Sequence, residues 1–291
     1  MTAVDIRVCR LSGSGGIVLA ADEAGQQDAA PVILMHGGGQ TRHAWSNATR
    51  ELAAAGFHVL SLDLRGHGDS AWATDGNYRL DAFVDDLLAV IATLTRKPAL
   101  VGASLGGVIS MLALGERDPA LAQALVLVDV APRMEAKGIA HIRDFMTSHL
   151  QGFADIDEAA EAVAAYAPHR PRPRDSSGLM KNLRRRDDGR LYWHWDPVFL
   201  ERRVPADPLS MMNRMAQAAS RIRVPTLLVR GKQSDVVSEE SAEHLRQLIP
   251  QAEVVDIQGA GHMVAGDRND HFNTAVLTFL RRHLLPDSSP G

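Results

Sequence analysis

Short runs of consecutive apolar residues alternate along the chain with longer amphipathic stretches. Continuous apolar runs are typical of strands that are buried on both faces of a sheet, and apolar positions at helical spacing indicate helices packed on one side. The expected strands are residues 31–35, 57–62, 98–101, 124–128, 226–230 and 252–256, and the expected helices are residues 42–55, 80–94, 105–114, 241–248 and 272–284. This alternation predicts an α/β fold with a mostly parallel central sheet flanked by helices.

The middle of the chain departs from this pattern. Residues 132–220 contain no run typical of a buried strand, but they show helical patterns around residues 138–150 and 156–165. We therefore expect a core domain formed by residues 1–131 and 221–291, with residues 132–220 inserted as a helical cap, or lid. Right-handed crossovers would bring the carboxyl ends of the parallel strands to one edge of the sheet, where ligands bind in such folds.

One glycine-flanked serine lies at a strand-to-helix junction. The segment Gly102-Ala103-Ser104-Leu105-Gly106 directly follows one expected strand and directly precedes an apolar helix. This arrangement predicts a nucleophile elbow, a tight turn in which flanking glycines let the backbone pass closely and expose the serine hydroxyl. The other interpretation is a serine that caps the helix N-terminus after a glycine turn. A nucleophilic Ser104 would need a base, because a serine hydroxyl is otherwise a poor nucleophile.

A histidine and several carboxylates follow at later strand ends. His262 comes after a Gly-Ala-Gly turn behind the last expected strand and is the predicted base. Asp235, in the turn after the preceding strand, is the preferred acid, because the chain order Ser, Asp, His is the order of this type of fold. Asp129, which ends the strand at residues 124–128, could reach the same imidazole, and Asp63 ends another strand. The acid would hold the imidazole tautomer and stabilise the imidazolium ion.

Acyl transfer also requires two hydrogen-bond donors aimed at the developing oxyanion. The backbone N–H of Leu105, directly after the nucleophile, is one expected donor. The other is expected from the glycine-rich loop at residues 36–39, with Gly38 preferred and Gly39 as the alternate. A flexible glycine turn without a donor role is the competing interpretation.

Further side chains are candidates for contact with a substrate. His36 and three aromatic residues of the cap, Tyr192, Trp193 and Trp195, are candidates to line an apolar pocket, although the aromatic residues could equally form the cap's own core. For the basic residues 184–186 we favour a solvated face over an anion-binding role.

The loop at residues 65–70 carries acidic residues and a histidine. Two acids and one histidine on a single loop are too few to predict a metal site. We expect a tight loop held by hydrogen bonds from Arg65 instead.

These motifs together resemble the α/β-hydrolase fold superfamily, in its capped branch of esterases, lactonases, C–C bond hydrolases, epoxide hydrolases, haloalkane dehalogenases and cofactor-free haloperoxidases. The matching pieces are His36-Gly37 and residues 63–70, 102–106, 231–235 and 259–262. Similar epoxide hydrolases and dehalogenases carry Asp at the elbow, and the serine in this chain argues against both. The resemblance implies a serine hydrolase with a catalytic triad of Ser104, His262 and Asp235, and an oxyanion hole from Leu105 and a glycine of the 36–39 loop.

The leading functional hypothesis is hydrolysis of a carboxylic ester or lactone through an acyl-enzyme. The alternatives are C–C bond or amide hydrolysis and haloperoxidase or perhydrolase chemistry with the same triad. A non-catalytic ligand-binding protein of the same fold is the alternative from a different functional class.

Composition narrows the set of partners. The formal net charge is −4 over 291 residues, which gives no reason to expect nucleic acid or an anionic membrane surface. No leader pattern and no apolar run of membrane-spanning length is visible, so a cytoplasmic location is expected. The single cysteine, Cys9, excludes an internal disulfide and a multi-thiolate metal site. We expect a small-molecule ester or lactone as substrate, no cofactor and no metal, and a homodimer is left open.

Overall fold

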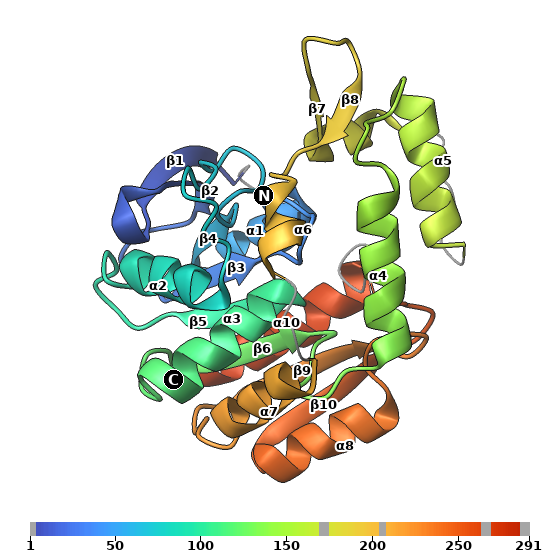
Figure 1. The fold of residues 1–291 in the computed structure, drawn as a ribbon. Coiled ribbons are helices and arrows are strands. Elements are labelled where there is room, and N and C mark those ends of the chain that lie inside the picture. Colours follow the sequence, from blue (N-terminus) through green and yellow to red (C-terminus); the bar gives the residue numbers. More distant parts are fainter. Residues whose placement is uncertain (1–3, 169–174, 204–207, 263–268, 286–291) are drawn as a thin grey trace.

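A central sheet forms the core of the computed structural model, which describes residues 4–168, 175–203, 208–262 and 269–285. Eight strands of these ranges lie in the order β1-β2-β4-β3-β5-β6-β9-β10. They are β1 (Ile6–Ser12), β2 (Val18–Ala24), β3 (Pro31–Met35), β4 (His58–Leu62), β5 (Ala99–Ala103), β6 (Ala124–Val128), β9 (Thr226–Gly231) and β10 (Ala252–Ile257). From β4 to β10 neighbouring strands are parallel, whereas β1 and β2 run antiparallel to their neighbours. The predicted α/β fold with a mostly parallel sheet is confirmed (Figure 1).

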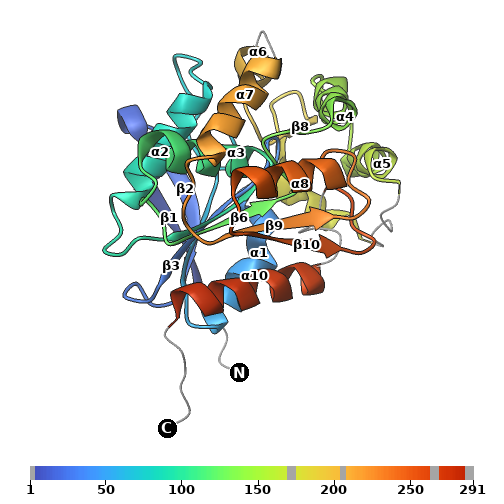
Figure 2. The ribbon, with the colours of Figure 1, turned by 90° about the horizontal axis from the view of Figure 1, so that it is seen from below.

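Helices cover both faces of this sheet. Helices α1 and α10 lie on one face, and α2, α3, α7 and α8 lie on the other (Figure 2). These helices are α1 (Ser46–Ala54), α2 (Leu80–Ile91), α3 (Leu105–Leu112), α7 (Pro208–Ala219), α8 (Glu239–Leu248) and α10 (Asn269–Leu284). Short helical turns are η1 (Ser14–Gly16), η2 (Arg42–Trp45), η3 (Ala113–Arg117) and η4 (Ser177–Asn182). Because helices cover both faces of the sheet, the ends of the strands are its exposed part, and a ligand site can form there.

The apolar runs are explained by burial on both faces of the sheet. In β3, Val32 and Leu34 belong to the apolar cluster that also contains Trp45 and residues of α10. Ile33 and Met35, which alternate with them, belong to the cluster that contains residues of α2 and α3. Because successive side chains of a strand point to opposite faces, both sets must be apolar when both faces are covered.

The segment between β6 and β9 contains helices and a small hairpin. It comprises α4 (Ala136–Ser148), α5 (Ile156–Tyr166), β7 (Leu183–Arg185), β8 (Leu191–Trp193) and α6 (Val198–Arg203), followed by α7. Figure 1 shows α4, α5 and the hairpin standing apart from the sheet, whereas α7 packs against α3. The hairpin was not predicted, because strands of three residues are too short to show an alternating pattern.

The hairpin is joined to the core by backbone hydrogen bonds. The amide of Gly68 donates to the carbonyl of His194 at 2.7 Å, and the amide of Asp196 donates to the carbonyl of Gly66 at 2.8 Å. The loop after β4 therefore pairs with the chain that leaves β8.

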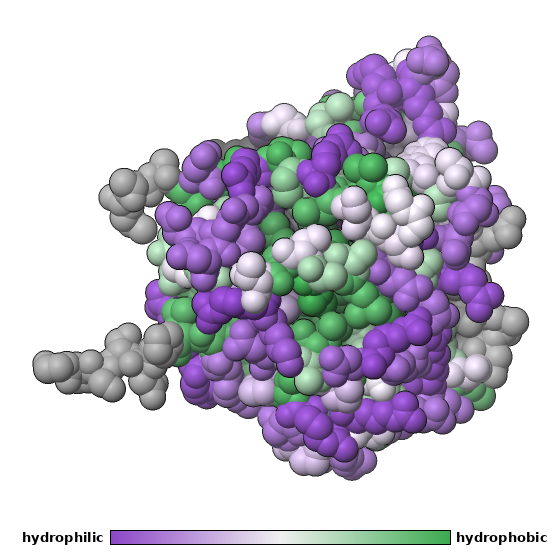
Figure 3. Space-filling model, turned by 90° about the vertical axis from the view of Figure 1, so that its left-hand side faces the viewer, coloured by the Kyte–Doolittle hydropathy of each residue, from purple (hydrophilic) through white to green (hydrophobic). Residues whose placement is uncertain are grey.

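The surface is mixed in polarity. On the face shown in Figure 3, apolar surface is gathered near the middle and hydrophilic side chains surround it. Val8 on edge strand β1 is among the exposed large apolar side chains. Within the described ranges, no helix combines the length and the apolar character that crossing a membrane requires.

Candidate active site

Ser104 lies on a strained turn between β5 and α3. Its backbone dihedral angles are φ 44° and ψ −108°, a region that non-glycine residues rarely adopt. The turn is held in place because the Ser104 amide donates to the carbonyl of Val128 on the neighbouring strand at 3.2 Å. A strained serine at the N-terminus of a helix is the geometry that the glycine-flanked motif predicts.

Two glycines make this turn possible through close backbone contacts. A Cβ atom added at Gly102 would lie 2.3 Å from the backbone carbon of Gly106. A Cβ atom added at Gly106 would lie 2.4 Å from the carbonyl oxygen of Met35. Both distances are far below van der Waals contact, so the elbow packs against β3 only without side chains at these positions.

Substitution of Gly106 by Ala is therefore expected to lower the free energy of unfolding by roughly 1–3 kcal/mol, the usual range for overpacking. Urea denaturation measures this change. The matched control is Gly178→Ala, because a Cβ atom there meets nothing within 4 Å. The control is expected to stay within about 0.5 kcal/mol of the unsubstituted chain. Equal stability of the two variants would contradict the close packing of the elbow.

His262 is held by a buried carboxylate. Its Nδ1 lies 2.7 Å from Oδ2 of Asp129, whose side chain is 0% exposed while that of His262 is 13% exposed. Asp129 also accepts hydrogen bonds from the Gly231 amide at 3.0 Å and from the Ser234 hydroxyl at 2.6 Å. Three donors thus fix the carboxylate, and the carboxylate in turn fixes the imidazole. The role of Ser234 was not predicted, although this residue lies in the turn after β9 that the sequence indicates as part of the site.

The expected pairing of His262 with Asp235 is wrong. The Asp235 side chain is 43% exposed, and its Oδ2 lies 3.1 Å from Nδ1 of His141 on α4. Asp129 directly follows β6 and turns its side chain toward β9 at φ 48°, whereas Asp235 lies four residues beyond the end of β9. By that point the chain has turned away from the sheet toward α4. The alternative acid, Asp129, is the one that the structure places against the imidazole.

Ser104 and Asp129 occupy equivalent positions on neighbouring strands. Ala103 of β5 pairs with Val128 of β6, so the next residue of each strand lies at the same edge of the sheet. Parallel strands are about 4.8 Å apart, and His262 contacts Asp129, so its ring lies over this edge. Among the described residues, no hydrogen bond joins the Ser104 hydroxyl to His262. Catalytic hydrogen bonds are often long without substrate and shorten in the complex.

Two backbone amides beside Ser104 are without a hydrogen-bond acceptor. Within the described ranges neither the amide of Leu105 nor that of Gly38 donates a hydrogen bond, whereas the Gly39 amide donates to Nε2 of His67 at 3.1 Å. The N–H of the alternate donor Gly39 is therefore already used in a hydrogen bond, and Gly38 remains as the candidate donor of this loop. Leu105 is the first residue of α3, whose helix dipole adds positive potential at this point.

Two histidines hold the glycine loop from inside. The amide of Leu64 donates to Nε2 of His36 at 3.1 Å, so Nδ1 of His36 carries the proton and donates to the Gly37 carbonyl at 2.7 Å. Burial lowers the pKa of His36, which keeps this ring neutral. His67 was not among the predicted site residues, and its Nε2 accepts from the Gly39 amide. His36 is fully buried, so it holds the loop and does not line a pocket.

The aromatic candidates of the inserted segment lie in three different environments. Trp195 is buried beside the loop, since a Cβ atom at Gly39 would lie 3.7 Å from its Nε1. Trp193 packs in an aromatic cluster of the inserted segment, with ring centroids 5.6 Å from Phe145 and 5.1 Å from Phe153. Tyr192 donates to Asp188 at 2.6 Å in the hairpin turn. Trp195 thus lies next to the glycine loop, and a pocket-lining role for Trp193 and Tyr192 stays a prediction.

Met146 of α4 was not predicted, but it lies close to the same loop. A Cβ atom added at Gly39 would lie 2.8 Å from its Cε. A single Met in an amphipathic helix carries no signal that distinguishes such a position from ordinary packing.

The acidic residues after β4 bind arginines. Arg42 donates to the carboxylates of Asp63 and Asp69, and Arg65 donates to Asp86 at 2.6 and 2.7 Å. Arg65 thus ties the loop to α2, whereas the loop itself is closed by the Gly66 amide, which donates to the Ala71 carbonyl at 3.0 Å. In the part of the chain that the structure describes, no group of three His, Cys, Asp or Glu side chains is arranged to hold a metal ion.

Comparison with known proteins identifies the family to which the chain belongs. The family model of the alpha/beta hydrolase fold matches residues 30–268. An esterase of Mycobacterium tuberculosis is 31% identical over 245 residues, which cover 81% of this chain and 78% of the relative. An sn-1-specific diacylglycerol lipase of Mus musculus is 29% identical over 265 residues, which cover 86% of this chain and 80% of the relative.

Solved structures share the fold. The crystal structure of an E-2-(acetamidomethylene)succinate hydrolase superposes with a TM-score of 0.81 at 23% identity, covering 95% of this chain and 99% of the other. At this level of identity the likeness shows the fold alone. Since the family model spans most of the chain and the relatives are hydrolases, the protein belongs to the alpha/beta hydrolase fold family and is a hydrolase of that superfamily.

Proposed function

We propose that the protein cleaves carboxylic esters or lactones through an acyl-enzyme on Ser104. The observation that carries this proposal is the 2.7 Å contact between His262 Nδ1 and the buried Asp129 at the edge of the sheet where the strained Ser104 turn ends β5. A histidine oriented by a carboxylate beside a partly exposed serine is the arrangement that makes a hydroxyl nucleophilic.

The reaction follows from the roles of the ring nitrogens. Because Nδ1 of His262 donates to Asp129, Nε2 is the nitrogen that takes the proton of Ser104 while Oγ bonds to the substrate carbonyl carbon. The carbonyl oxygen becomes an oxyanion, which the amides of Leu105 and Gly38 stabilise. The C–O bond to the leaving group then breaks, and His262 returns the proton to the departing oxygen. Water activated by the same imidazole hydrolyses the acyl-enzyme and regenerates Ser104.

We also propose that residues 132–220 act as a cap over this site, with residues 1–131 and 221–291 as the catalytic core. The proposal is supported by the positions of Met146 and Trp195 beside Gly39. The start of α4 is anchored to the core, since His141 contacts Asp235 and the Glu135 amide donates to the Val236 carbonyl at 2.9 Å. Apolar side chains next to the oxyanion loop would exclude water and contact the acyl group.

Covalent labelling tests the proposal directly. A fluorophosphonate is expected to react with the folded protein at Ser104, found by mass spectrometry of the labelled peptide, and ester turnover should fall in proportion to labelling. The control is the same chain unfolded in urea, which should not react because the hydroxyl then has no base. If the folded chain stays unlabelled, a ligand-binding protein of this fold becomes the better interpretation.

A substrate panel distinguishes the reactions that share this triad. Turnover of p-nitrophenyl esters and lactones, with no cleavage of diketones and no peroxide-dependent oxidation, is the expected result. Preferential diketone cleavage would assign C–C bond hydrolysis to the same three side chains, and peroxide-dependent oxidation would assign perhydrolase chemistry.

A further inference from the structure

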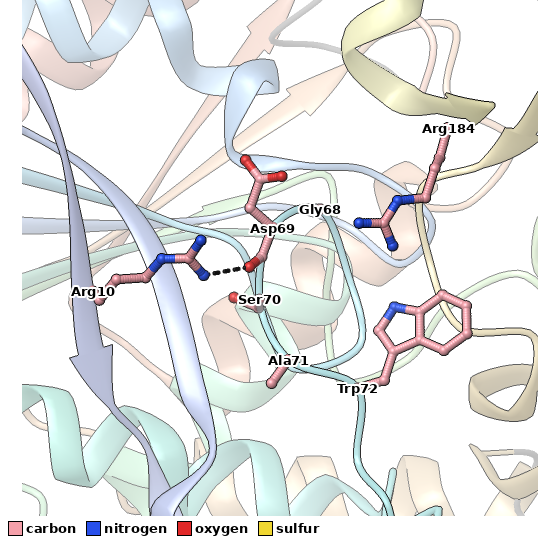
Figure 4. Close-up of a pocket in the computed structure, with 7 residues that line it drawn as sticks. All are labelled: Arg10, Gly68, Asp69, Ser70, Ala71, Trp72 and Arg184. Atoms are coloured by element: carbon pink, nitrogen blue, oxygen red, sulfur yellow. Dashed lines mark hydrogen bonds between the residues drawn. The ribbon is translucent and has the colours of Figure 1, made fainter. Parts of the chain in front are cut away.

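A cavity separate from the Ser104 site lies on the outer side of the loop that follows β4. Its volume is about 330 Å³, and its walls come from β1, from the loop after β4 and from the hairpin strand β7. The lining residues are Arg10, Gly68, Asp69, Ser70, Ala71, Trp72 and Arg184 (Figure 4). None of them belongs to the site around Ser104. The volume lies at the lower end of the range for small-molecule sites.

Arg184 differs from the two arginines that follow it in the hairpin. Arg185 donates to the Gly189 carbonyl, and Arg186 lies over the ring of Tyr192 at 4.0 Å from its centroid. The side chain of Arg184 makes no hydrogen bond or ion pair within the described ranges, and Figure 4 shows its guanidinium group directed toward the cavity. A guanidinium group offers a planar fork of donors that matches a carboxylate.

Trp72 lies on the same side of the cavity as Arg184 (Figure 4). Its side chain is among the exposed large apolar ones, with the residue 37% exposed. Its indole N–H donates to no acceptor in the part of the chain that the structure describes. An exposed indole offers a flat face for a second ring as well as a hydrogen-bond donor.

The residues that line the cavity carry two guanidinium groups, those of Arg10 and Arg184, and one carboxylate, that of Asp69. The Asp69 carboxylate is 43% exposed and accepts from Arg42 at 2.8 Å, a guanidinium group that it shares with Asp22 and Asp63. Arg10 lies on the opposite side of the cavity and donates to the backbone carbonyl of Asp69 at 2.7 Å, without a carboxylate partner among the described residues (Figure 4). Two guanidinium groups without an acid partner therefore face one cavity.

We propose that this cavity binds a small aromatic carboxylate, with the carboxylate on Arg184 and the ring on Trp72. Arg10 adds positive potential from the other side. The site is independent of the function proposed for Ser104, because it shares no residue with that site, and the two proposals can fail separately.

Fluorine NMR with 4-fluorobenzoate tests this site on the full chain. We expect saturable binding that weakens at least tenfold in Arg184→Gln and at least fivefold in Trp72→Leu. The matched control Arg185→Gln removes a neighbouring charge whose hydrogen bond stays inside the hairpin, and it should bind within twofold of the unsubstituted chain. Circular dichroism of each variant checks that the fold is retained.

Two further measurements distinguish binding in this cavity from apolar adsorption and from binding at Ser104. The neutral analogue 4-fluorobenzyl alcohol should bind at least tenfold more weakly, since it carries no charge for Arg184. Binding of 4-fluorobenzoate should be unchanged in Ser104→Ala. Equal loss in Arg184→Gln and Arg185→Gln, equal binding of the alcohol, or loss of binding in Ser104→Ala would each overturn the proposal.

Discussion

Replacing Ser104 by Ala is expected to lower kcat for p-nitrophenyl ester hydrolysis by about 10⁶-fold, as removal of the nucleophile does in a well-studied serine protease. The reason is that no other hydroxyl is placed on the strained turn between β5 and α3, so the covalent route through the acyl-enzyme is lost. The residual rate would come from the oxyanion amides and substrate binding alone. Steady-state turnover of the ester measures the loss.

Ser110→Ala is the matched control for this variant. Ser110 lies on the same helix and is buried, but its hydroxyl donates to the Gly106 carbonyl at 2.8 Å and does not reach the strand edge. Its turnover should stay within about twofold of the unsubstituted chain. Unchanged ester turnover in Ser104→Ala would remove the catalytic role that we propose for this residue.

Asp129→Asn is expected to lower kcat by about 10⁴-fold, whereas Asp235→Asn should change it by no more than a few-fold. The Asp129 carboxylate accepts from Gly231, Ser234 and His262, and an amide cannot accept from all three donors. The amide would turn an N–H toward His262 and favour the wrong imidazole tautomer. Among the described residues, the hydrogen-bond partner of the Asp235 carboxylate is the exposed His141.

The two variants form a matched pair, because each removes one negative charge near the same strand ends. Circular dichroism and thermal unfolding check that both variants fold. This check matters most for Asp129→Asn, because a buried amide N–H that faces donors and finds no acceptor costs about 1–3 kcal/mol of stability. A larger loss of kcat in Asp235→Asn than in Asp129→Asn would contradict the assignment of the acid.

Much of the fold could be predicted because burial imposes local patterns on the sequence. The run at residues 31–35 became β3 with the predicted bounds, since both of its faces are covered by helices. The hairpin of β7 and β8 was missed, because its short strands contain three residues each and lie outside the sheet. The pattern of apolar and polar residues predicts a strand or helix only when the element is long enough to show its repeat.

The glycine loop at residues 36–39 shows the limit of local patterns. Its glycines indicated a loop with amides to offer, but they are equivalent in the sequence. The choice between Gly38 and Gly39 depends on His67, which lies 28 residues after Gly39 and accepts the hydrogen bond of its amide. This hydrogen bond depends on how two loops pack against each other, and a short sequence motif does not contain that information.

By itself, the sequence determined the strand-to-helix rhythm, the serine between two glycines and the histidine behind the last strand, because each follows from residues that are neighbours in the chain. The tertiary structure alone decided which acid meets that histidine. Both Asp129 and Asp235 lie between Ser104 and His262 in the chain, so chain order cannot separate them. The order of the strands in the sheet does separate them, because β6 lies between β5 and β9. The sharp turn at the end of β6 directs Asp129 to the imidazole, whereas the turn after β9 places Asp235 beside α4.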